Sequence, residues 1–383
     1  MILRDELATK INLDNGVIKK LKIKDYKNIL VLTGPKNSLS IFKKHIEKRL
    51  KSKFHLYSKI RTNPSENDIY NIVNFARSKK IDAILSVGGG AVMDCGRMVS
   101  LLLSHGGLLH EYVEGGTIGT VGITPNLIYH ITVPTISGSG GEVSGVATFK
   151  RANRFYTISS PFLRPNETYI DPKLMLNIPK QVWANIAFGG FIKSLEAYVS
   201  TYSTYVSDMF AEESLKAYIT NLKPLLENTK NLDYINKIVV ASLNSLIAKN
   251  MSSGGAISAI ASSLSATLNI HHGTCLALLT PEVSDINYVY NKPKYNKIIE
   301  MFGEKEKVND KKEIDTTKSK TKSIGEILSK FIDDIGVHLP SIKNKLNELA
   351  IDVISDQSIT YKIFGNPKDI TKQDVMKVLY KLK

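Results

Sequence analysis

The sequence has few cysteines and no long apolar run. Of its 383 residues only Cys95 and Cys275 are cysteines, which excludes a disulfide framework and a site built from several thiolates. Isolated cysteines fit a reduced compartment, where they behave as small buried hydrophobic side chains. No run approaches the roughly 18 apolar residues of a membrane-spanning helix, and the first seven residues are not those of a secretory signal. We therefore expect a cytoplasmic protein that does not associate with membranes.

The charge is strongly basic but not concentrated. The formal net charge of +15 and the pI near 9.4 would suit a nucleic-acid-binding protein. However, the lysines are spread along the chain among acidic residues, and the aromatic residues do not alternate with them as a stacking platform requires. We expect no nucleic-acid partner. A basic surface that attracts anionic cofactors and metabolites explains the charge more simply.

Two patterns divide the chain. The first part alternates apolar strands, predicted over 28–33, 82–87 and 128–133, with helices predicted over 40–50 and 69–77. Such alternation is typical of a parallel sheet covered on both faces. From Ile178 onward the periodicity is helical, interrupted by a polar segment over 304–322 that reads as a solvated loop. The sequence predicts an α/β domain over 1–155 and an all-α domain over 156–383.

Two glycine-rich loops follow predicted strands. Gly88-Gly89-Gly90 precedes a helix, and backbone N–H groups at such a junction can approach a phosphate closely. The spacing is not G-x-G-x-x-G, so the usual Rossmann fingerprint is absent. The second loop, Pro134 to Glu142, is rich in hydroxyl groups. Together the loops favour a dinucleotide at the switch point of an α/β sheet, although each could also be a plain turn.

These motifs resemble those of the iron-containing (group III) alcohol dehydrogenase family, which has the fold of glycerol dehydrogenase and dehydroquinate synthase. GGGAVMDCGRM at 88–98 is similar to the family's GGGS-x-x-D-x-x-K, and PTISGSGGEVS at 134–144 to its PTTAGTGSEVT. Further similar segments lie at 159–179, 196–200, 272–283 and 365–381. The resemblance covers nearly the whole chain. It implies a Rossmann-like dinucleotide domain followed by a helical domain on the metal and substrate side.

The resemblance also implies a nicotinamide dinucleotide, NAD or NADP, as cofactor. Many NAD-preferring members place an acidic residue after the second strand, where this chain has Gly34 and nearby Lys36. The absence of an acid that would repel a 2′-phosphate favours NADP. The residues that the resemblance places around the cofactor are Gly34, Lys36, Asn63, Gly88, Gly89, Gly90, Asp94, Thr135, Ser137 and Ser139.

The family's metal ligands are largely replaced. Members hold a divalent ion with one Asp and three His, and the implied positions fall at Gly189, Lys193, Ser258 and His272, with Ser262 at a neighbouring active-site His position. One imidazole beside an ammonium cannot hold a catalytic divalent ion, which normally has three or more protein ligands. We therefore expect no catalytic metal.

Lys193 stands where the resemblance places the cation. Its ammonium could donate to a carbonyl oxygen, stabilise the developing alkoxide and protonate it. His272 could relay the proton, while Ser258, Ser262 and His271 could contact the substrate. Two simpler interpretations remain: Lys193 could pair with Glu196 one turn further on, and His272 could be an ordinary histidine at a helix end.

The functional prediction is a metal-independent, NAD(P)-dependent alcohol dehydrogenase or carbonyl reductase acting on a small alcohol, aldehyde or ketone. By resemblance it would form a homodimer or a larger homo-oligomer. The alternative is a catalytically inactive dinucleotide-binding homologue, serving as a sensor or as a partner in an oligomer. A cyclase like dehydroquinate synthase is disfavoured, because that chemistry also relies on the metal and on basic residues that the sequence does not supply.

Overall fold

The chain folds into two compact units. The computed structural model describes residues 9–23, 25–138, 140–304, 322–361, 363 and 365–383. Unit 1 comprises Met1–Ile178 and Thr229–Val239, and unit 2 comprises Pro179–Asn228 and Val240–Lys383. The division falls later than the expected boundary at 155/156, because the strand Glu167–Ile170 still belongs to the sheet of unit 1.

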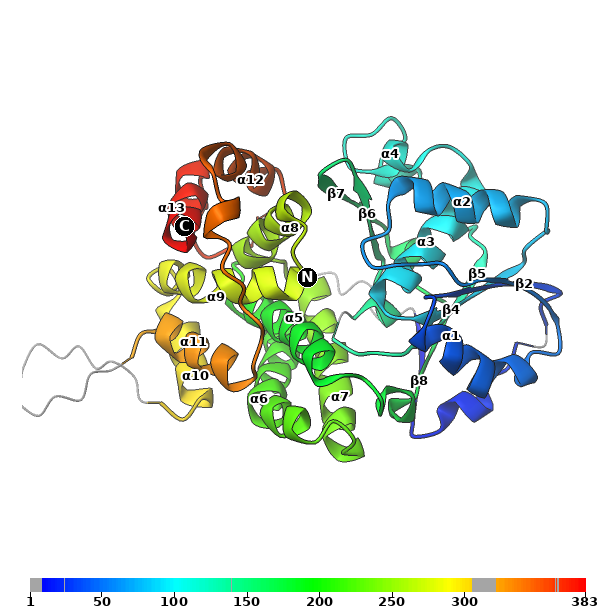
Figure 1. The fold of residues 1–383 in the computed structure, drawn as a ribbon, viewed down its shortest axis with the longest axis horizontal. Helices are drawn as coiled ribbons and strands as arrows, with labels where there is room; N and C mark the ends of the chain where they lie inside the picture. The colour runs from blue at the N-terminus through cyan, green and yellow to red at the C-terminus, as the bar shows by residue number, and fades with distance from the viewer. Residues whose placement is uncertain (1–8, 24, 139, 305–321, 362, 364) are drawn as a thin grey trace, which may run out of the picture. The chain divides into compact units, whose positions relative to one another are not determined.

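Unit 1 is built on a six-stranded sheet in which every pair of neighbouring strands is parallel. The three predicted strands are confirmed to within one residue, and β2 and β4 are almost completely buried, as expected for a sheet covered on both faces. The strand order is β1 (Lys10–Leu13), β8 (Glu167–Ile170), β5 (Tyr129–Pro134), β4 (Ala83–Gly88), β2 (Asn28–Thr33) and β3 (Lys53–Tyr57). Figure 1 labels β2, β4, β5 and β8 of this sheet.

Several strands were not predicted from the sequence. The outer strands β1 and β3 are short and only partly buried, so they carry no continuous apolar run. β6 (Val146–Arg151) and β7 (Arg154–Ser159) form a separate antiparallel hairpin whose turn contains Ala152 at φ 50°. Their inward residues alternate with exposed ones, a weaker signal than the buried central strands give.

Helices cover both faces of the sheet, each over its own apolar cluster. The predicted helix over 69–77 is α2 (Glu66–Arg77), which starts earlier because Ser65 and Asp68 form a capping box. α3 (Gly90–His105) packs beside it. The helix predicted over 40–50 is instead a short α1 (Asn37–Ile41) followed by a π-turn and a 3₁₀ turn.

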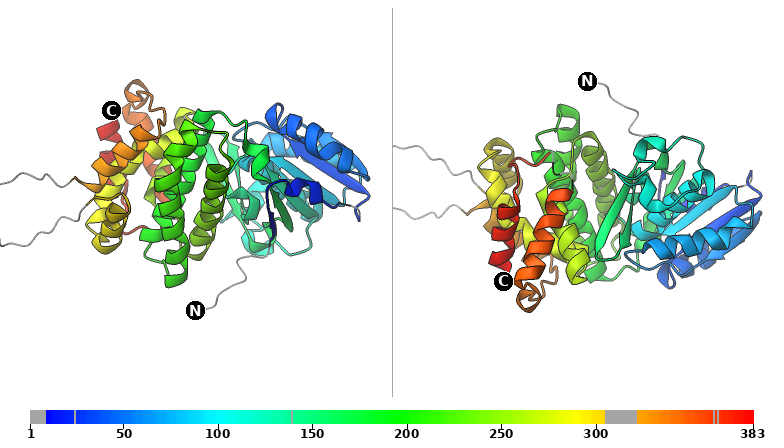
Figure 2. Two further views of the ribbon diagram at one scale, coloured as in Figure 1. Left: turned by 90° about the horizontal axis from the view of Figure 1, so that it is seen from below. Right: turned by 90° about the horizontal axis from the view of Figure 1, so that it is seen from above.

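Unit 2 is helical throughout its described residues, as predicted, and Figure 2 shows its helices packed against one another without an intervening strand. Most of the predicted polar loop, residues 305–321, lies outside the described residues. None of the described helices has the length and apolar character needed to cross a bilayer. Its helices are α5 (Lys180–Val199), α6 (Tyr205–Glu227), α8 (Ala256–Leu268), α9 (His272–Tyr288), α10 (Lys292–Met301), α11 (Ile324–Asp334), α12 (Glu348–Thr360) and α13 (Lys372–Leu382), together with the part of α7 (Leu232–Met251) that follows Val239.

Both cysteines are free and buried, one in each unit. Burial raises the pKa of Cys275 to about 12 and that of Cys95 well above its ordinary value, so both thiols stay protonated at neutral pH. The expectation that they act as small hydrophobic side chains is confirmed.

Gly96 fixes how closely α3 approaches the sheet. His130 of β5 and Ser86 of β4 form a buried pair, with 2.9 Å between Ser86 Oγ and His130 Nε2. Burial, helped by the charge of Arg97, lowers the pKa of His130 to about 3 and keeps it neutral. A Cβ on Gly96 would lie 2.4 Å from both His130 Nε2 and Ser86 Oγ. The helix can therefore sit on this pair only with glycine at position 96.

We predict opposite effects for two Gly→Ala changes inside helices. Gly96→Ala should lower the free energy of unfolding by about 1–3 kcal/mol, because overpacking outweighs the gain in helix propensity. Gly189→Ala in α5 should leave stability unchanged or raise it by up to about 1 kcal/mol, since its Cβ would meet only Leu276 Cδ1 at 3.7 Å. Urea unfolding monitored by circular dichroism measures both. Equal effects would contradict the packing role of Gly96.

Candidate active site

The loops predicted to hold a dinucleotide leave the sheet at one edge. β2 lies beside β4 with Thr33 opposite Val87, and β4 lies beside β5 with Gly88 opposite Pro134. Because these strands are parallel, their carboxyl ends meet at the same edge. From β2 the chain passes outward to β3 and then returns to β4 on the other side of β2, so the switch point lies between β2 and β4.

Glycines at the first loop let the chain turn tightly into α3. A Cβ on Gly88 would lie 2.5 Å from Val92 Cγ2, and one on Gly89 would lie 3.1 Å from Ile136 Cγ2. Gly89 is the N-cap residue of α3, and no side chain caps this helix end. The N-terminus of the helix at Gly90 therefore presents backbone N–H groups and a partial positive charge, a combination that binds phosphate.

The second loop lies directly beside the first. Thr135 N–H donates to the carbonyl of Gly88 at 3.1 Å. The hydroxyl oxygen of Ser137 is completely buried and has no hydrogen-bond partner within the described part of the chain. Leaving a buried hydroxyl unpaired costs about 1–3 kcal/mol, a loss that a polar ligand atom would relieve. Ser139, also expected near the cofactor, lies outside the described residues.

Asp94 of α3 organises these loops through a buried arginine. Its carboxylate oxygens contact Arg97 Nη1 at 2.7 Å and accept from the N–H of Thr148 at 3.3 Å. Arg97, which is buried, also donates through Nε to the carbonyl of Ser144 at 2.8 Å and through Nη2 to the carbonyl of Gly141. The expected contact of Asp94 with a cofactor remains a prediction. Arg97 was not predicted, although it occupies the Lys position of the GGGS-x-x-D-x-x-K motif.

The outer part of the edge is basic and exposed. Lys36 is the N-cap residue of α1, directly after β2, and it borders a surface hollow together with Lys43 and Lys44. The sequence prediction named only Lys36. Asn63, exposed at φ 53°, lies in the connection from β3 to α2 at the same edge. A Cβ on Gly34 would lie 3.3 Å from the carbonyl oxygen of Ile60, a tight contact, so a larger residue here would require that carbonyl to shift by a few tenths of an ångström.

In unit 2, a buried carboxylate joins α5 to α8. Glu196 is only 4% exposed, and its two oxygens accept from the N–H of Ser258 at 2.8 Å and from Ser258 Oγ at 2.5 Å. Burial raises the pKa of Glu196, and the hydrogen bonds from Ser258 and the positive charge of Lys249 oppose that rise. Ser258 therefore orients Glu196, in addition to any role toward a substrate.

His272 opens α9 and is held neutral. Burial is the main cause that lowers its pKa to about 3, and the charges of Lys193 and Lys249 lower it further. A hydrogen bond with the backbone of Ala261 fixes the ring. Two ammonium groups from α5 and α7 thus act on one imidazole. Lys249, which is half-buried, was missed from the sequence because it matches no motif and its helix shows no unusual pattern.

The remaining candidates have local hydrogen bonds. His271 is the N-cap residue of α9, and its Nδ1 accepts from the N–H of Gly273 at 3.1 Å. Ser262 Oγ donates to the carbonyl of Ser258 at 2.8 Å. The interpretation of His271 and Ser262 as substrate contacts remains a prediction.

The residues at the positions where the family would place its metal ligands do not fit a divalent cation. Gly189 offers no ligand atom, Lys193 offers a positive charge, and the hydroxyl proton of Ser258 points to Glu196. Within the ranges that the structure describes, no three His, Cys, Asp or Glu side chains gather as a metal site requires. A divalent ion prefers three or more neutral or anionic donors, and only His272 supplies one among the family's ligand positions.

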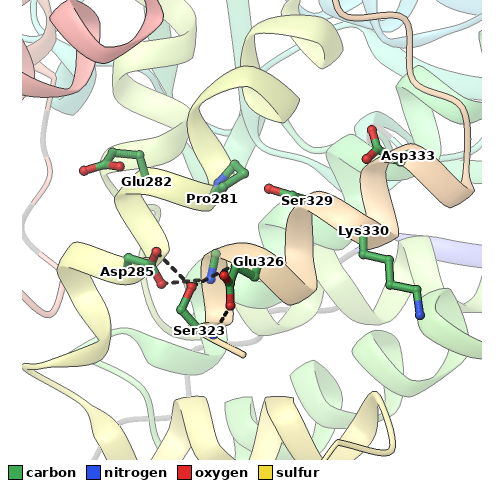
Figure 3. Close-up of a pocket in the computed structure, with 9 residues that line it drawn as sticks. Pro281, Glu282, Asp285, Ser323, Glu326, Ser329, Lys330 and Asp333 are labelled. Carbon is green, nitrogen blue, oxygen red and sulfur yellow. Dashed lines mark hydrogen bonds between the residues drawn. The ribbon is translucent and has the colours of Figure 1, made fainter. Parts of the chain in front are cut away.

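A surface hollow lies where α9 packs against α11. Figure 3 shows Asp285 of α9 directed at the start of α11, where it accepts from Gly325 N–H at 2.8 Å and from Ser323 Oγ at 3.2 Å. A Cβ on Gly325 would lie 2.4 Å from Asp285 Oδ2. The hollow, about 450 Å³ in volume, has no cysteine or histidine among its lining residues.

We predict that two serines one turn apart on α8 differ in importance. Ser258→Ala removes a hydrogen bond to a buried carboxylate, so the free energy of unfolding should fall by about 1.5–3 kcal/mol. Ser262→Ala, the control, removes only a bond to a helix carbonyl that remains bonded within α8 and should cost less than about 1 kcal/mol. Chemical denaturation at pH 7 distinguishes them. A larger loss for Ser262→Ala would mean that Ser258 does not anchor Glu196.

Comparisons with known proteins agree with this architecture. The sequence profile described as "Iron-containing alcohol dehydrogenase" matches residues 8–172, and that described as "Fe-containing alcohol dehydrogenase family, C-terminal" matches residues 189–382. Among relatives, the 1,3-propanediol dehydrogenase of Klebsiella pneumoniae is 27% identical over 251 residues, which cover 65% of this chain and 64% of that protein. The match thus spans just under two thirds of that relative's length.

Solved structures share the fold over the whole chain. An alcohol dehydrogenase from Oenococcus oeni has a TM-score of 0.84 at 22% identity, with 98% of both chains covered. The sulfoacetaldehyde reductase of Bifidobacterium kashiwanohense in complex with NAD+ has a TM-score of 0.84 at 17% identity, covering 100% of this chain and 99% of that one. At these identities the structures show the fold alone. With both halves matched by the family's sequence profiles, the chain belongs to the iron-containing alcohol dehydrogenase family.

Proposed function

We propose that this protein is an NAD(P)-dependent oxidoreductase that interconverts a small alcohol and its aldehyde or ketone without the family's metal. The observation that carries the proposal is the combination of two sites. Unit 1 keeps a bare helix N-terminus between glycine-rich loops, while unit 2 has an ammonium group, Lys193, at a metal-ligand position.

The residues of unit 1 fit a dinucleotide. The backbone at Gly88, Gly89 and Gly90 would bind the pyrophosphate, and Ser137 would donate its otherwise unpaired hydroxyl. When bound, the nicotinamide supplies or accepts a hydride. A solved relative in complex with NAD+ supports this cofactor class. We further propose that Lys36, with Lys43 and Lys44 beside it, favours NADP, since these side chains would attract a 2′-phosphate.

Lys193 would act on the substrate oxygen. In reduction, two electrons reach the carbonyl carbon as hydride while the oxygen gains negative charge. The Lys193 ammonium would donate a hydrogen bond to this oxygen and then its proton, giving the alcohol and a neutral amine that is reprotonated from solvent. His272, neutral at pH 7, would accept a hydrogen bond and orient Lys193 or the substrate hydroxyl. Its expected role in relaying the proton remains a prediction.

We predict that replacing two buried serines of unit 1 has different effects: one replacement weakens cofactor binding and the other lowers stability. Ser137→Ala should weaken NADPH or NADH binding about 10-fold, the loss of one hydrogen bond, without lowering the melting temperature of the ligand-free protein. Ser100→Ala, the control, removes a bond from Ser100 Oγ to the carbonyl of Ile128 at 3.0 Å and should lower stability but not affinity. Fluorescence titration and thermal melting give both values. Unchanged affinity in Ser137→Ala would refute the cofactor contact.

We predict that turnover depends on Lys193 and not on metal. Lys193→Met should lower kcat/KM for aldehyde reduction about 10²- to 10⁴-fold, the usual contribution of a positioned acid, while the dissociation constant of NADPH stays the same. Lys193→Arg should keep the charge but donate a proton poorly, because guanidinium is too weak an acid. The rate of NADPH consumption with a panel of aldehydes gives kcat/KM for the wild type and both variants.

Metal analysis and chelation complete that test. The wild type treated with EDTA should keep its activity, and it should contain less than stoichiometric zinc or iron when purified. Stoichiometric metal whose removal abolishes turnover would overturn the proposal. Tight cofactor binding without turnover on any carbonyl would instead identify an inactive dinucleotide-binding homologue.

A further inference from the structure

Within unit 1 the positive charge is more concentrated than the chain as a whole suggests. Residues 17–61 contain fourteen Lys and Arg but only two acidic residues, Asp25 and Glu47. This segment therefore accounts for +12 of the net charge of +15, and the rest of the chain carries only +3.

The parts of this segment lie side by side in the fold. The 3₁₀ turn Val17–Lys20 and the turns that follow α1 place their apolar residues in one cluster on the same side of the sheet. Arg49 Nη1 donates to the carbonyl of Lys19 at 3.4 Å, and Ser52 Oγ donates to the carbonyl of Ile23 at 3.2 Å. The chain then enters β3, the last strand of the sheet on this side. The basic residues thus share one continuous region of the surface of unit 1.

This charge is hardly compensated. All thirteen basic side chains that the structure describes in residues 17–23 and 25–61 are exposed, and we call them the basic face. Within the described part of the chain only one of them forms an ion pair, Lys20 with Asp14 at 3.8 Å, and both partners are exposed. Like charges held close together repel one another, and an anionic partner would relieve that repulsion.

The composition of the basic face indicates the kind of partner. No large apolar or aromatic side chain of residues 17–23 and 25–61 is exposed. Protein interfaces have aromatic or apolar centres that are depleted in lysine, and stable binding to a membrane takes an apolar anchor in addition to basic charge. Single-stranded nucleic acid is bound on aromatic rings. A duplex requires none of these, because its phosphates can be bound by positive charges alone.

We propose that the basic face binds double-stranded nucleic acid through its phosphate backbone, without preference for sequence. Eleven of the thirteen residues are lysines, which act as point charges, whereas base recognition typically uses the planar fork of arginine. This replaces the expectation of no nucleic-acid partner, which rested on lysines spread along the chain. The inference goes beyond the proposed function and does not depend on it.

The test measures the affinity for a duplex and its salt dependence. Fluorescence anisotropy with two unrelated duplexes of about 24 base pairs should give equal dissociation constants, and log K should fall with log[salt] with a slope of about −5, as for five to six phosphate contacts. The triple variant Lys22→Gln, Lys48→Gln, Lys51→Gln should weaken binding at least about 10-fold and reduce the magnitude of the slope by about 3. These three side chains are exposed and form no ion pair or hydrogen bond within the described ranges, so the melting temperature should not change.

A matched triple variant in unit 2 controls for the overall loss of charge. Lys180→Gln, Lys343→Gln and Lys345→Gln remove the same three charges at exposed positions. Because these lysines lie in unit 2 and not on the basic face, the affinity and the slope should stay close to those of the wild type.

Three results would overturn the inference. The first is an equal loss of affinity in both triple variants, or no loss in the first one. The second is tighter binding of single strands than of duplexes. The third is tighter binding, at the same salt concentration, to vesicles of phosphatidylcholine and phosphatidylserine, which would identify a membrane surface as the partner. Carbonyl turnover is not a readout of this test, so failure of the proposed function would leave its outcome unaffected.

Discussion

The hydrogen bonds between the Glu196 carboxylate and Ser258 determine the chemistry that unit 2 can support. A buried carboxylate must be paired or hydrogen-bonded, and here the first turn of α8 supplies both a backbone N–H and a hydroxyl. This arrangement fixes α5 against α8. It also engages the hydroxyl at a position where relatives would provide an imidazole to a metal. The carboxylate also feels the positive charge of Lys249.

In unit 1, too, a buried charged group is held by hydrogen bonds to its surroundings. The buried guanidinium of Arg97 reaches Asp94 on its own helix and two backbone carbonyls in the loop after β5. Two of these three directed bonds from one planar group hold that loop against α3, and the third fixes the guanidinium on the helix. Charged groups thus organise both candidate sites from inside the protein, and small residues occupy the positions proposed to face a ligand: Gly88, Gly89 and Ser137 in unit 1, and Gly189 in unit 2.

The sequence predicted the central strands well and the peripheral elements poorly. β2, β4 and β5 are buried on both faces, so their apolar runs are continuous and their ends are marked by glycine or proline. β6, β7 and β8 have mixed burial or are short, and the boundary between the units shifted because of β8. At the candidate site, motif spacing identified Lys193, Ser258 and His272. The sequence could not indicate that Lys249 and Arg97 belong to the candidate sites, since the role of a lysine or an arginine depends on which groups its charge faces after folding.

The sequence by itself determined the family, the two-part architecture and the replacement of metal ligands, because these depend on residue identity and order along the chain. Only the tertiary structure decided which polar groups satisfy one another: that Ser258 holds Glu196, that Arg97 reaches the carbonyls of Gly141 and Ser144, and that Lys249 influences the Glu196 carboxylate. Such pairings join residues from different helices or loops, often more than 40 positions apart in sequence. Their geometry is fixed by how whole elements pack, and no local pattern records it.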